Sequence, residues 1–187
     1  MGVEGDAADA TVSVTLRPPV PMGYFGGVPF VCALAVCEAL REAGITEAGV
    51  AWPYDVVTPQ GPLAEVRVRA GYDEEGMFAV CNVLMNDAAG FASAVKKAVR
   101  ARVDAWAASV CASCAAAGPL ASVLSDLFDA MPLMGAPVEV VRSGRSLGRG
   151  LLGGMDVWGR VTVHLDDGRT LELAPEQGGL RPVGEQD

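Results

Sequence analysis

Positive charge is scarce in this chain. Its 187 residues include 14 lysines and arginines against 23 aspartates and glutamates, which gives a formal net charge of −9. A protein with this balance repels phosphate backbones, and its few basic residues form no stripe along the sequence. We therefore do not expect it to bind nucleic acid.

Long hydrophobic runs are lacking too. The longest uncharged apolar run near the start, Val28 to Cys37, is too short to cross a bilayer. The first ten residues are acidic and do not form a basic segment followed by an apolar one, so we expect no secretory signal. These absences favour a cytoplasmic protein with no membrane-spanning segment.

Metal-binding side chains are sparse, with one histidine and an odd number of cysteines, five. The cysteines lie in apolar or alanine-rich stretches, which is typical of buried free thiols in a reducing compartment. Cys111 and Cys114 have the spacing of a zinc or redox pair, but no second pair follows. We expect no metal site.

The remaining composition, 51% hydrophobic and 20% charged, is that of a globular protein with a sizeable core. Alternating hydroxyl and apolar side chains predict a strand at Thr11–Leu16. Apolar residues at helical spacing predict a buried helix over Val28–Ala43. Pro29 fits its first turn and Gly44 fits the position just after its end.

Strand patterns follow that helix. We predict strands at Gly49–Thr58 and Leu63–Ala70, joined by a turn at Pro59–Gly61, and a third strand at Gly76–Met85. Asn86 and Asp87 are then suited to cap a long helix. Its predicted apolar stripe consists of Phe91, Val95, Val99, Val103, Trp106 and Val110.

The sequence pattern changes from helical to strand-like in the last third of the chain. Gly118-Pro119 ends the long helix, and a second helix face is predicted at Leu120, Val123, Leu124, Leu127, Phe128 and Met131. From Val138 onward, short strand patterns alternate with turn signals, which is typical of a small antiparallel barrel. We predict an α+β fold: a mixed sheet backed by helices over residues 1–135, then a barrel over 136–187.

Two short segments carry a family resemblance. Ala51-Trp52-Pro53-Tyr54-Asp55 and Pro62-Leu63-Ala64-Glu65 resemble the active-site strand pair of biotin–protein ligases, which reads Lys-Trp-Pro-Asn-Asp and then Lys-Leu-Ala-Gly. Ser13, Asn86 and the stretch from Arg149 to Val161 also resemble family positions. The resemblance covers residues 11–183 and implies a class II synthetase-like catalytic domain followed by an SH3-like barrel.

The resemblance also implies a reaction. Family members use ATP with magnesium to make biotinyl-adenylate, and then transfer biotin to a lysine of the biotin carboxyl carrier protein. The residues of this chain that match ligand-binding positions are Trp52, Pro53, Asp55, Leu63, Ala64 and Asn86. Each also has an ordinary structural reading: Trp52-Pro53 as strand-end packing, Asp55 as a local backbone acceptor, and Asn86 as a helix cap.

The departures from the family bear on catalysis. Ala51 and Pro62 stand at the two lysine positions, Tyr54 at an asparagine and Glu65 at a glycine. The family's glycine- and arginine-rich loop is expected before Thr11, where this sequence shows no such segment. We name no catalytic residue and expect the chain to be inactive alone, as a degenerate binding or regulatory module.

Two alternatives stay open. The chain could be the C-terminal half of a split ligase that a partner chain completes. It could also be a module that dimerises through the polar sheet face that carries Glu65, Arg67 and Arg69.

Overall fold

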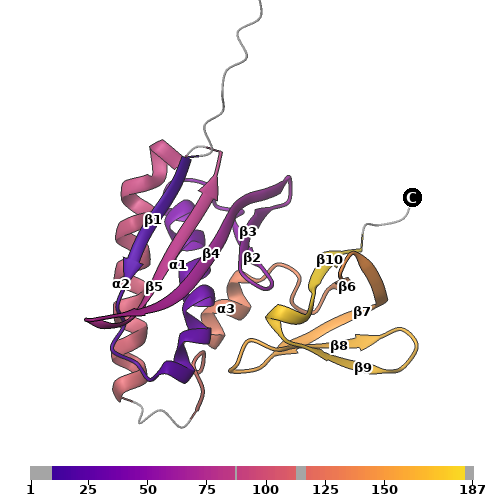
Figure 1. Ribbon diagram of the computed structural model, residues 1–187. Helices are drawn as coiled ribbons and strands as arrows, with labels where there is room; N and C mark the ends of the chain where they lie inside the picture. Colours follow the sequence, from indigo (N-terminus) through magenta and orange to yellow (C-terminus); the bar gives the residue numbers. More distant parts are fainter. Residues whose placement is uncertain (1–9, 87, 113–116, 184–187) are drawn as a thin grey trace, which may run out of the picture.

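The computed structural model describes residues 10–86, 88–112 and 117–183. Two antiparallel sheets and three α-helices make up the described chain (Figure 1). In spatial order, the first sheet consists of β1 (Ala10–Leu16), β5 (Gly76–Met85), β4 (Gly61–Asp73), β3 (Asp55–Thr58) and β2 (Gly49–Ala51).

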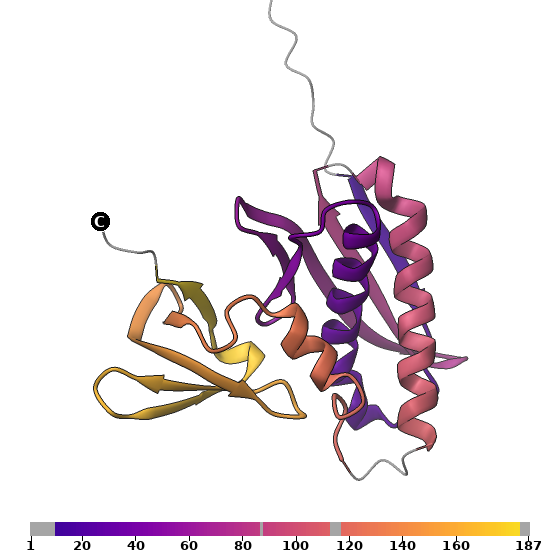
Figure 2. The ribbon, with the colours of Figure 1, turned by 180° about the vertical axis from the view of Figure 1, so that it is seen from behind.

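The first sheet has one covered and one open face. Helices α1 (Val28–Glu42) and α2 (Ala88–Ala112) cover the same face, as Figures 1 and 2 show from opposite sides. On β1, the residues Val12, Val14 and Leu16 are buried, and Thr11, Ser13 and Thr15 are exposed. The alternation of the sequence therefore places the apolar side chains under the helices and the hydroxyls on the open face.

Helix α1 forms the centre of the core. A 3-10 helix, η1 (Met22–Gly27), leads into it, and Gly44 follows its end with φ of 104°. The segment Met22–Glu42 is long and apolar enough to cross a membrane by length and composition alone, but 78% of its apolar 18-residue window is buried inside the protein. Such burial is that of a core helix.

The predicted stripe of α2 is confirmed, since Val95, Val99, Val103, Trp106 and Val110 are buried and Phe91 is partly buried against the core. The predicted cap at Asp87 lies outside the described residues. Helix α3 (Leu124–Ala130) is shorter than the predicted apolar face. Leu120 and Val123 are buried in the turns before it, because a buried turn shows the same apolar spacing as a short helix.

Arg102 on α2 is partly buried where α1 and α3 approach this helix. Its side chain is only 26% exposed, and its guanidinium pairs with Asp126 and lies 3.5 Å from Glu38. It thereby joins α2 to α3 and α1.

Two expectations for the first sheet are wrong. Every strand pair among the described residues is antiparallel, so the sheet is not mixed. The segment Gly49–Thr58 is also not one strand. It reverses at a turn over Trp52, Pro53 and Tyr54, with a cis Trp52–Pro53 peptide bond, so that β2 pairs back onto β3.

The second sheet forms the C-terminal part. In spatial order it consists of β10 (Gly179–Pro182), β6 (Pro137–Arg142), β7 (Arg145–Met155), β8 (Val161–Leu165) and β9 (Thr170–Leu173). A short 3-10 helix, η2 (Pro175–Gln177), connects β9 to β10. Among the described strands β9 and β10 do not pair with each other, so a closed barrel is not confirmed.

Specific contacts join the two sheets. The indole Nε1–H of Trp52 donates to the carbonyl of Gly159, 2.9 Å away in the β7–β8 turn. The rings of Phe30 and Tyr54 pack edge to face with centroids 5.4 Å apart. A Cβ at Gly159 would lie 2.4 Å from the ring of Phe30, so only glycine allows this close approach. The turn after β2 is therefore held between α1 and the second sheet.

Candidate functional site

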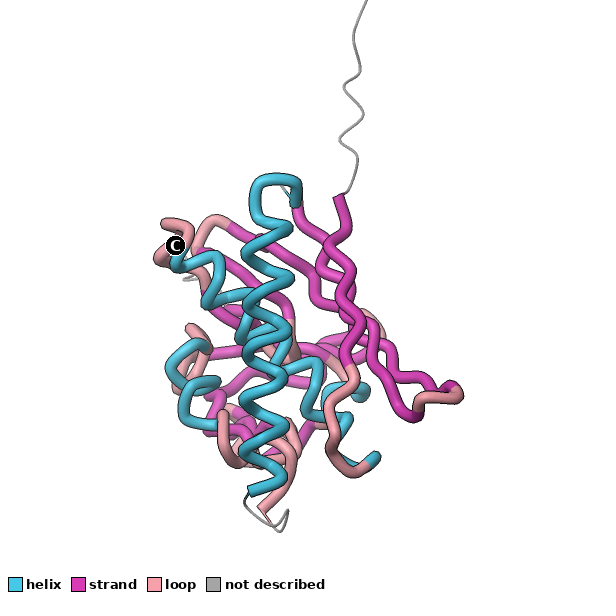
Figure 3. Tube along the Cα trace, turned by 90° about the vertical axis from the view of Figure 1, so that its left-hand side faces the viewer, coloured by secondary structure: helices cyan, strands magenta, loops and turns pink. Residues whose placement is uncertain are grey.

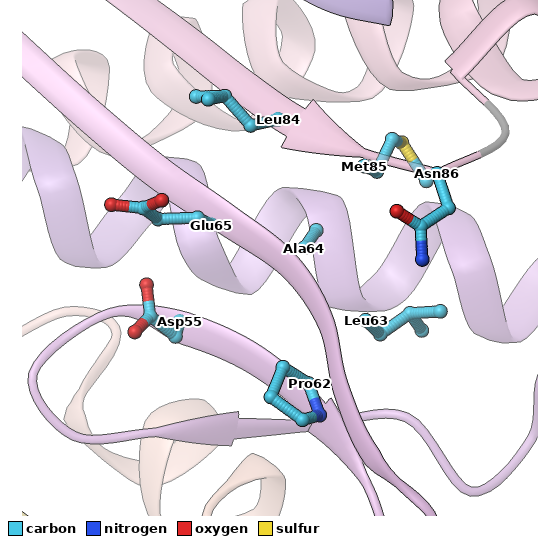
Figure 4. A pocket seen from close by; sticks show the side chains of 8 residues that line it. All are labelled: Asp55, Pro62, Leu63, Ala64, Glu65, Leu84, Met85 and Asn86. Atoms are coloured by element: carbon cyan, nitrogen blue, oxygen red, sulfur yellow. The ribbon is translucent and has the colours of Figure 1, made fainter. Parts of the chain in front are cut away.

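A hollow of about 360 Å³ lies where β3, β4 and β5 meet at one end of the first sheet (Figure 4). We call it the β3–β4–β5 cleft. Its lining residues are Asp55, Pro62, Leu63, Ala64, Glu65, Leu84, Met85 and Asn86. The pairing register explains why they meet, because Ala64 is opposite Met85 and Glu65 is opposite Leu84.

The charged groups that line the cleft are both carboxylates, Asp55 and Glu65. Figure 4 shows them near each other on one side of the hollow, with the Asn86 amide on the other. Burial, and after it the neighbouring Glu65, raise the pKa of Asp55, although the Val66 backbone N–H donates to its carboxylate. Burial of the Asp55 carboxylate therefore raises its pKa by more than the hydrogen bond from the Val66 N–H lowers it.

Glu65 has a partner of its own. Arg67 lies two residues along the same strand and donates Nε–H to Oε1 at 2.6 Å and Nη2–H to Oε2 at 2.8 Å. This bidentate pair holds the guanidinium beside Glu65 and offsets much of its charge. Asp55 is half-buried and forms no ion pair of this kind among the described residues, although the nearby Arg67 guanidinium partly counteracts the rise in its pKa.

The residues predicted to bind ligand divide into two groups. Asp55, Leu63, Ala64 and Asn86 line the cleft. Trp52 and Pro53 are not among the lining residues, and the Trp52 indole is buried against the Gly159 carbonyl.

The two positions at which the family has lysine also differ in location. Pro62 lines the cleft, whereas Ala51 is half-buried on β2, opposite Asp55 in the β2–β3 register. Neither side chain can donate a proton or carry a charge.

Sequence reasoning did not single out Leu84 and Met85 as cleft residues. Both belong to the predicted strand Gly76–Met85, and Met85 directly precedes Asn86. Their position follows from the pairing of β5 with β4, which strand-length patterns do not specify.

None of the described cysteines lines the cleft. Cys32 and Cys81 are buried and hydrogen-bonded to each other, which, with burial, raises the pKa of the Cys32 thiol. Cys111 is exposed, and its predicted companion Cys114 lies outside the described residues. Within the described ranges, no three His, Cys, Asp or Glu side chains are grouped as a metal site requires.

Comparison with solved structures identifies the architecture. A structure of the biotin protein ligase from Aquifex aeolicus superposes with a TM-score of 0.66 over 90% of this chain and 81% of the ligase, at 15% identity. The fold is that of a biotin protein ligase. The same enzyme in complex with biotin and ATP gives a TM-score of 0.66 over 92% of this chain and 78% of the enzyme, at 16% identity.

Its apo structure gives a TM-score of 0.65 over 90% of this chain and 81% of the enzyme, at 16% identity. The sequence itself matches no protein-family model and no curated protein. The ligase-like fold thus persists here at an identity where side-chain chemistry has to be assessed residue by residue.

Proposed function

We propose that this protein is a biotin–protein-ligase-like binding module that does not form or transfer an adenylate by itself. The observation that carries the proposal is the lining of the β3–β4–β5 cleft. Two carboxylates, Asp55 and Glu65, line it, and lysine, arginine and histidine are absent from its described lining residues.

The electrostatic reason is direct. Forming an acyl-adenylate and transferring its acyl group both build negative charge, which a catalyst stabilises with donors or cations fixed nearby. Removing one such group costs about 10²–10³ in rate. Pro62 offers no donor in the cleft, the half-buried Asp55 carboxylate would repel the phosphate, and the nearby Arg67 is engaged by Glu65.

The apolar part of the cleft supports retained ligand binding. Leu63, Ala64 and Met85 provide a hydrophobic wall, and the Asn86 amide can both donate and accept hydrogen bonds. The volume of about 360 Å³ falls in the range of small-molecule sites. The ligand class that fits the proposal is biotin or lipoate, bound without nucleotide.

The proposal includes a domain division. Residues 1–135 form the ligase-like domain, and residues 136–187 form an SH3-like module built on the second sheet. We place the protein in the cytoplasm, with a biotin carboxyl carrier protein or a second copy of the chain as possible partners of the module.

Calorimetry and a transfer assay test the proposal together. Titration of the purified chain with biotin, lipoate and Mg·ATP is expected to give heat for biotin or lipoate and none for Mg·ATP. Incubation with biotin, Mg·ATP and a biotin carboxyl carrier domain is expected to leave the carrier unlabelled on a streptavidin blot. Robust labelling by the chain alone would overturn the proposal.

A second candidate function is a ligase subunit that a partner completes. The observation that favours it is the outer edge of β1, which no described strand occupies. In this case, carrier labelling appears only when a second polypeptide supplies the missing cations. Co-purification followed by the same transfer assay separates the two functions.

A further inference from the structure

An exposed tryptophan borders a second hollow, which lies on the C-terminal part of the molecule. Trp158, in the turn between β7 and β8, is 51% exposed, which is unusual for so large an apolar side chain. The hollow measures about 330 Å³, and its lining residues are Trp158, Arg160, Ala174, Pro175 and Glu176. We call it the Trp158 groove. It shares no lining residue with the β3–β4–β5 cleft.

The turn that carries Trp158 is fixed by several contacts. The Asp156 carboxylate Oδ1 accepts from the backbone N–H of Trp158 at 2.8 Å and from that of Arg160 at 3.0 Å. The Trp52 indole donates to a carbonyl of the same turn, and the Trp158 ring packs against Tyr24 with centroids 6.4 Å apart. An aromatic ring held in this way loses little conformational freedom on binding, so it is suited to anchor a partner.

The wall of the groove formed by η2 is fixed as well. The Gln177 side chain accepts from the Ala174 N–H at 2.9 Å, and the Arg142 Nε–H donates to the Gln177 carbonyl at 2.8 Å. Pro175 stands at the first position of η2. Both walls are therefore held by internal hydrogen bonds, as a preformed site requires.

The backbone around the groove has few free donors. The N–H groups of Trp158, Arg160 and Ala174 already donate to side chains of the protein. Pro175 has no N–H. An added β-strand would therefore find no ladder of donors here. A polyproline II segment needs none, because it binds through proline rings that pack on aromatic side chains.

Charge restricts the occupant further. Arg160 is paired with Asp156, to which it donates from Nε at 2.7 Å, and its Nη2 lies 2.6 Å from the same carboxylate. Glu176 is exposed and forms no ion pair among the residues that the structure describes. The charge left at the groove is therefore negative, and a lysine or arginine complements it.

Segments of this chain do not meet both requirements. Residues 1–9 and 184–187 contain neither proline nor a basic residue. The segment Arg17–Pro21 combines an arginine with three prolines. However, Arg17 is paired with Asp73, with Nη2 and Oδ2 2.6 Å apart. A second copy of the chain thus has no free basic, proline-rich segment to offer in its described part, which favours a different polypeptide.

We propose that the Trp158 groove binds a proline-rich segment of a partner protein in the polyproline II conformation, with a proline ring packed on the Trp158 indole and a lysine or arginine paired with Glu176. The site recognises a protein and is separate from the cleft. It depends neither on biotin or lipoate binding nor on completion of a ligase by another chain.

The probe is a synthetic peptide, Arg-Pro-Pro-Ala-Pro-Pro-Ala-Pro-Pro-Arg, titrated into the isotope-labelled full chain. Arginine stands at both ends, so that either direction of binding brings a cation to Glu176. Indole N–H signals in NMR spectra report the outcome. The Trp158 signal is expected to shift until it saturates. The Trp106 signal should stay in place, because this indole is buried and donates to the Pro119 carbonyl.

Two control peptides separate the ring contacts from the charge. Glycine in place of every proline keeps both arginines and removes the rings, so this peptide should not bind. Glutamate in place of both arginines keeps the rings and should weaken binding about tenfold. Equal binding of the glycine and proline peptides would overturn the proposal. So would an unmoved Trp158 signal with the proline peptide in large excess.

The indole is tested by a pair of variants. Trp158→Ala should weaken peptide binding by about thirtyfold, the size of an aromatic anchor. Tyr72→Ala is the matched control, since it removes another exposed aromatic ring, on the β4–β5 hairpin that projects from the first sheet (Figure 3). It should leave binding unchanged. A Trp106 signal at its usual position shows that each variant is folded, and equal losses in both would contradict the assignment to the groove.

A second pair tests the carboxylate. Glu176→Gln should weaken binding about threefold, as expected for an exposed ion pair. Glu74→Gln makes the same change in the exposed β4–β5 turn and should have no effect. Equal effects would reduce the interaction to attraction by net charge and would contradict the ion pair. A Trp158 signal that moves on dilution without peptide would assign the groove to a second copy and would likewise overturn the proposal.

Discussion

The two segments that resemble a ligase active site have different environments in this protein. Trp52-Pro53 is buried between α1 and the second sheet, and the Trp52 indole donates to Gly159. Pro62–Glu65 lines a water-accessible cleft and carries no cation. The first segment thus connects the two sheets, whereas the second borders the cleft. A residue that matches the family motif can therefore serve packing, as Trp52 does, or line the cleft, as Asp55, Leu63 and Ala64 do.

Truncating Trp52 should produce the largest effect. Trp52→Ala removes a buried indole and leaves the Gly159 carbonyl without its donor, so we expect a loss of about 3–5 kcal/mol in unfolding free energy. Urea denaturation measures it. Trp52→Phe keeps most of the volume and should lose much less, with about 1 kcal/mol due to the hydrogen bond. An unchanged unfolding free energy in Trp52→Ala would contradict a structural role for the buried indole.

Gly159→Ala tests the other side of the same contact. Gly159 has φ of 82°, and the added Cβ would lie 2.4 Å from the Phe30 ring, so backbone strain and overpacking act together. We expect a loss of about 2–4 kcal/mol. Gly168→Ala is the matched control, since its φ is 85° but nothing lies within 4 Å. Equal losses in both variants would show that the contact with Phe30 is unimportant.

Restoring positive charge should change the cleft. Pro62→Lys combined with Glu65→Gln adds a cation and releases Arg67 from its partner, so ATP should bind at least about tenfold more tightly. Calorimetry at low ionic strength measures the change. Pro182→Lys with Glu172→Gln alters charge equally on the second sheet and serves as control. Equal gains in both double variants would argue against a nucleotide site in the cleft.

Asp55→Asn should give the smallest effect, visible in the pH dependence of stability. Burial raises the folded-state pKa of Asp55 above its ordinary value of 3.8, so the folded state binds the proton more tightly than the unfolded state. The stability of the wild type relative to Asp55→Asn should therefore fall as pH rises through the window from 3.8 to the raised folded value. We expect less than about 1 kcal/mol because the group is partly exposed. A difference that rises with pH would contradict this environment.

Local patterns predicted much of the fold. The strand Gly76–Met85 was predicted with its observed bounds, and the helix Val28–Ala43 ends one residue earlier than predicted. In both elements, a single hydrophobic periodicity runs along the whole segment and ends at a clear stop signal. The stretch Gly49–Thr58 was mistaken for one strand, because the apolar residues on both sides of Trp52-Pro53 continue the same alternation across a reversal.

The site was only partly predictable. Asp55, Leu63, Ala64 and Asn86 were expected at a ligand site and line the cleft. The partner of Trp52 is 107 residues away, and the partners of Arg102 lie on two other helices, so no local pattern specifies them. Tertiary contacts of this kind decide whether a conspicuous residue faces solvent or core.

The hydrogen bond from Trp52 to Gly159 has a practical corollary for anyone who shortens the gene. A fragment that stops near residue 135 would lose the backbone carbonyl that receives the indole proton and would bare an aromatic ring to water. We expect such a fragment to aggregate during expression. The C-terminal part therefore covers the turn that carries Trp52, and its removal is expected to destabilise the remaining domain.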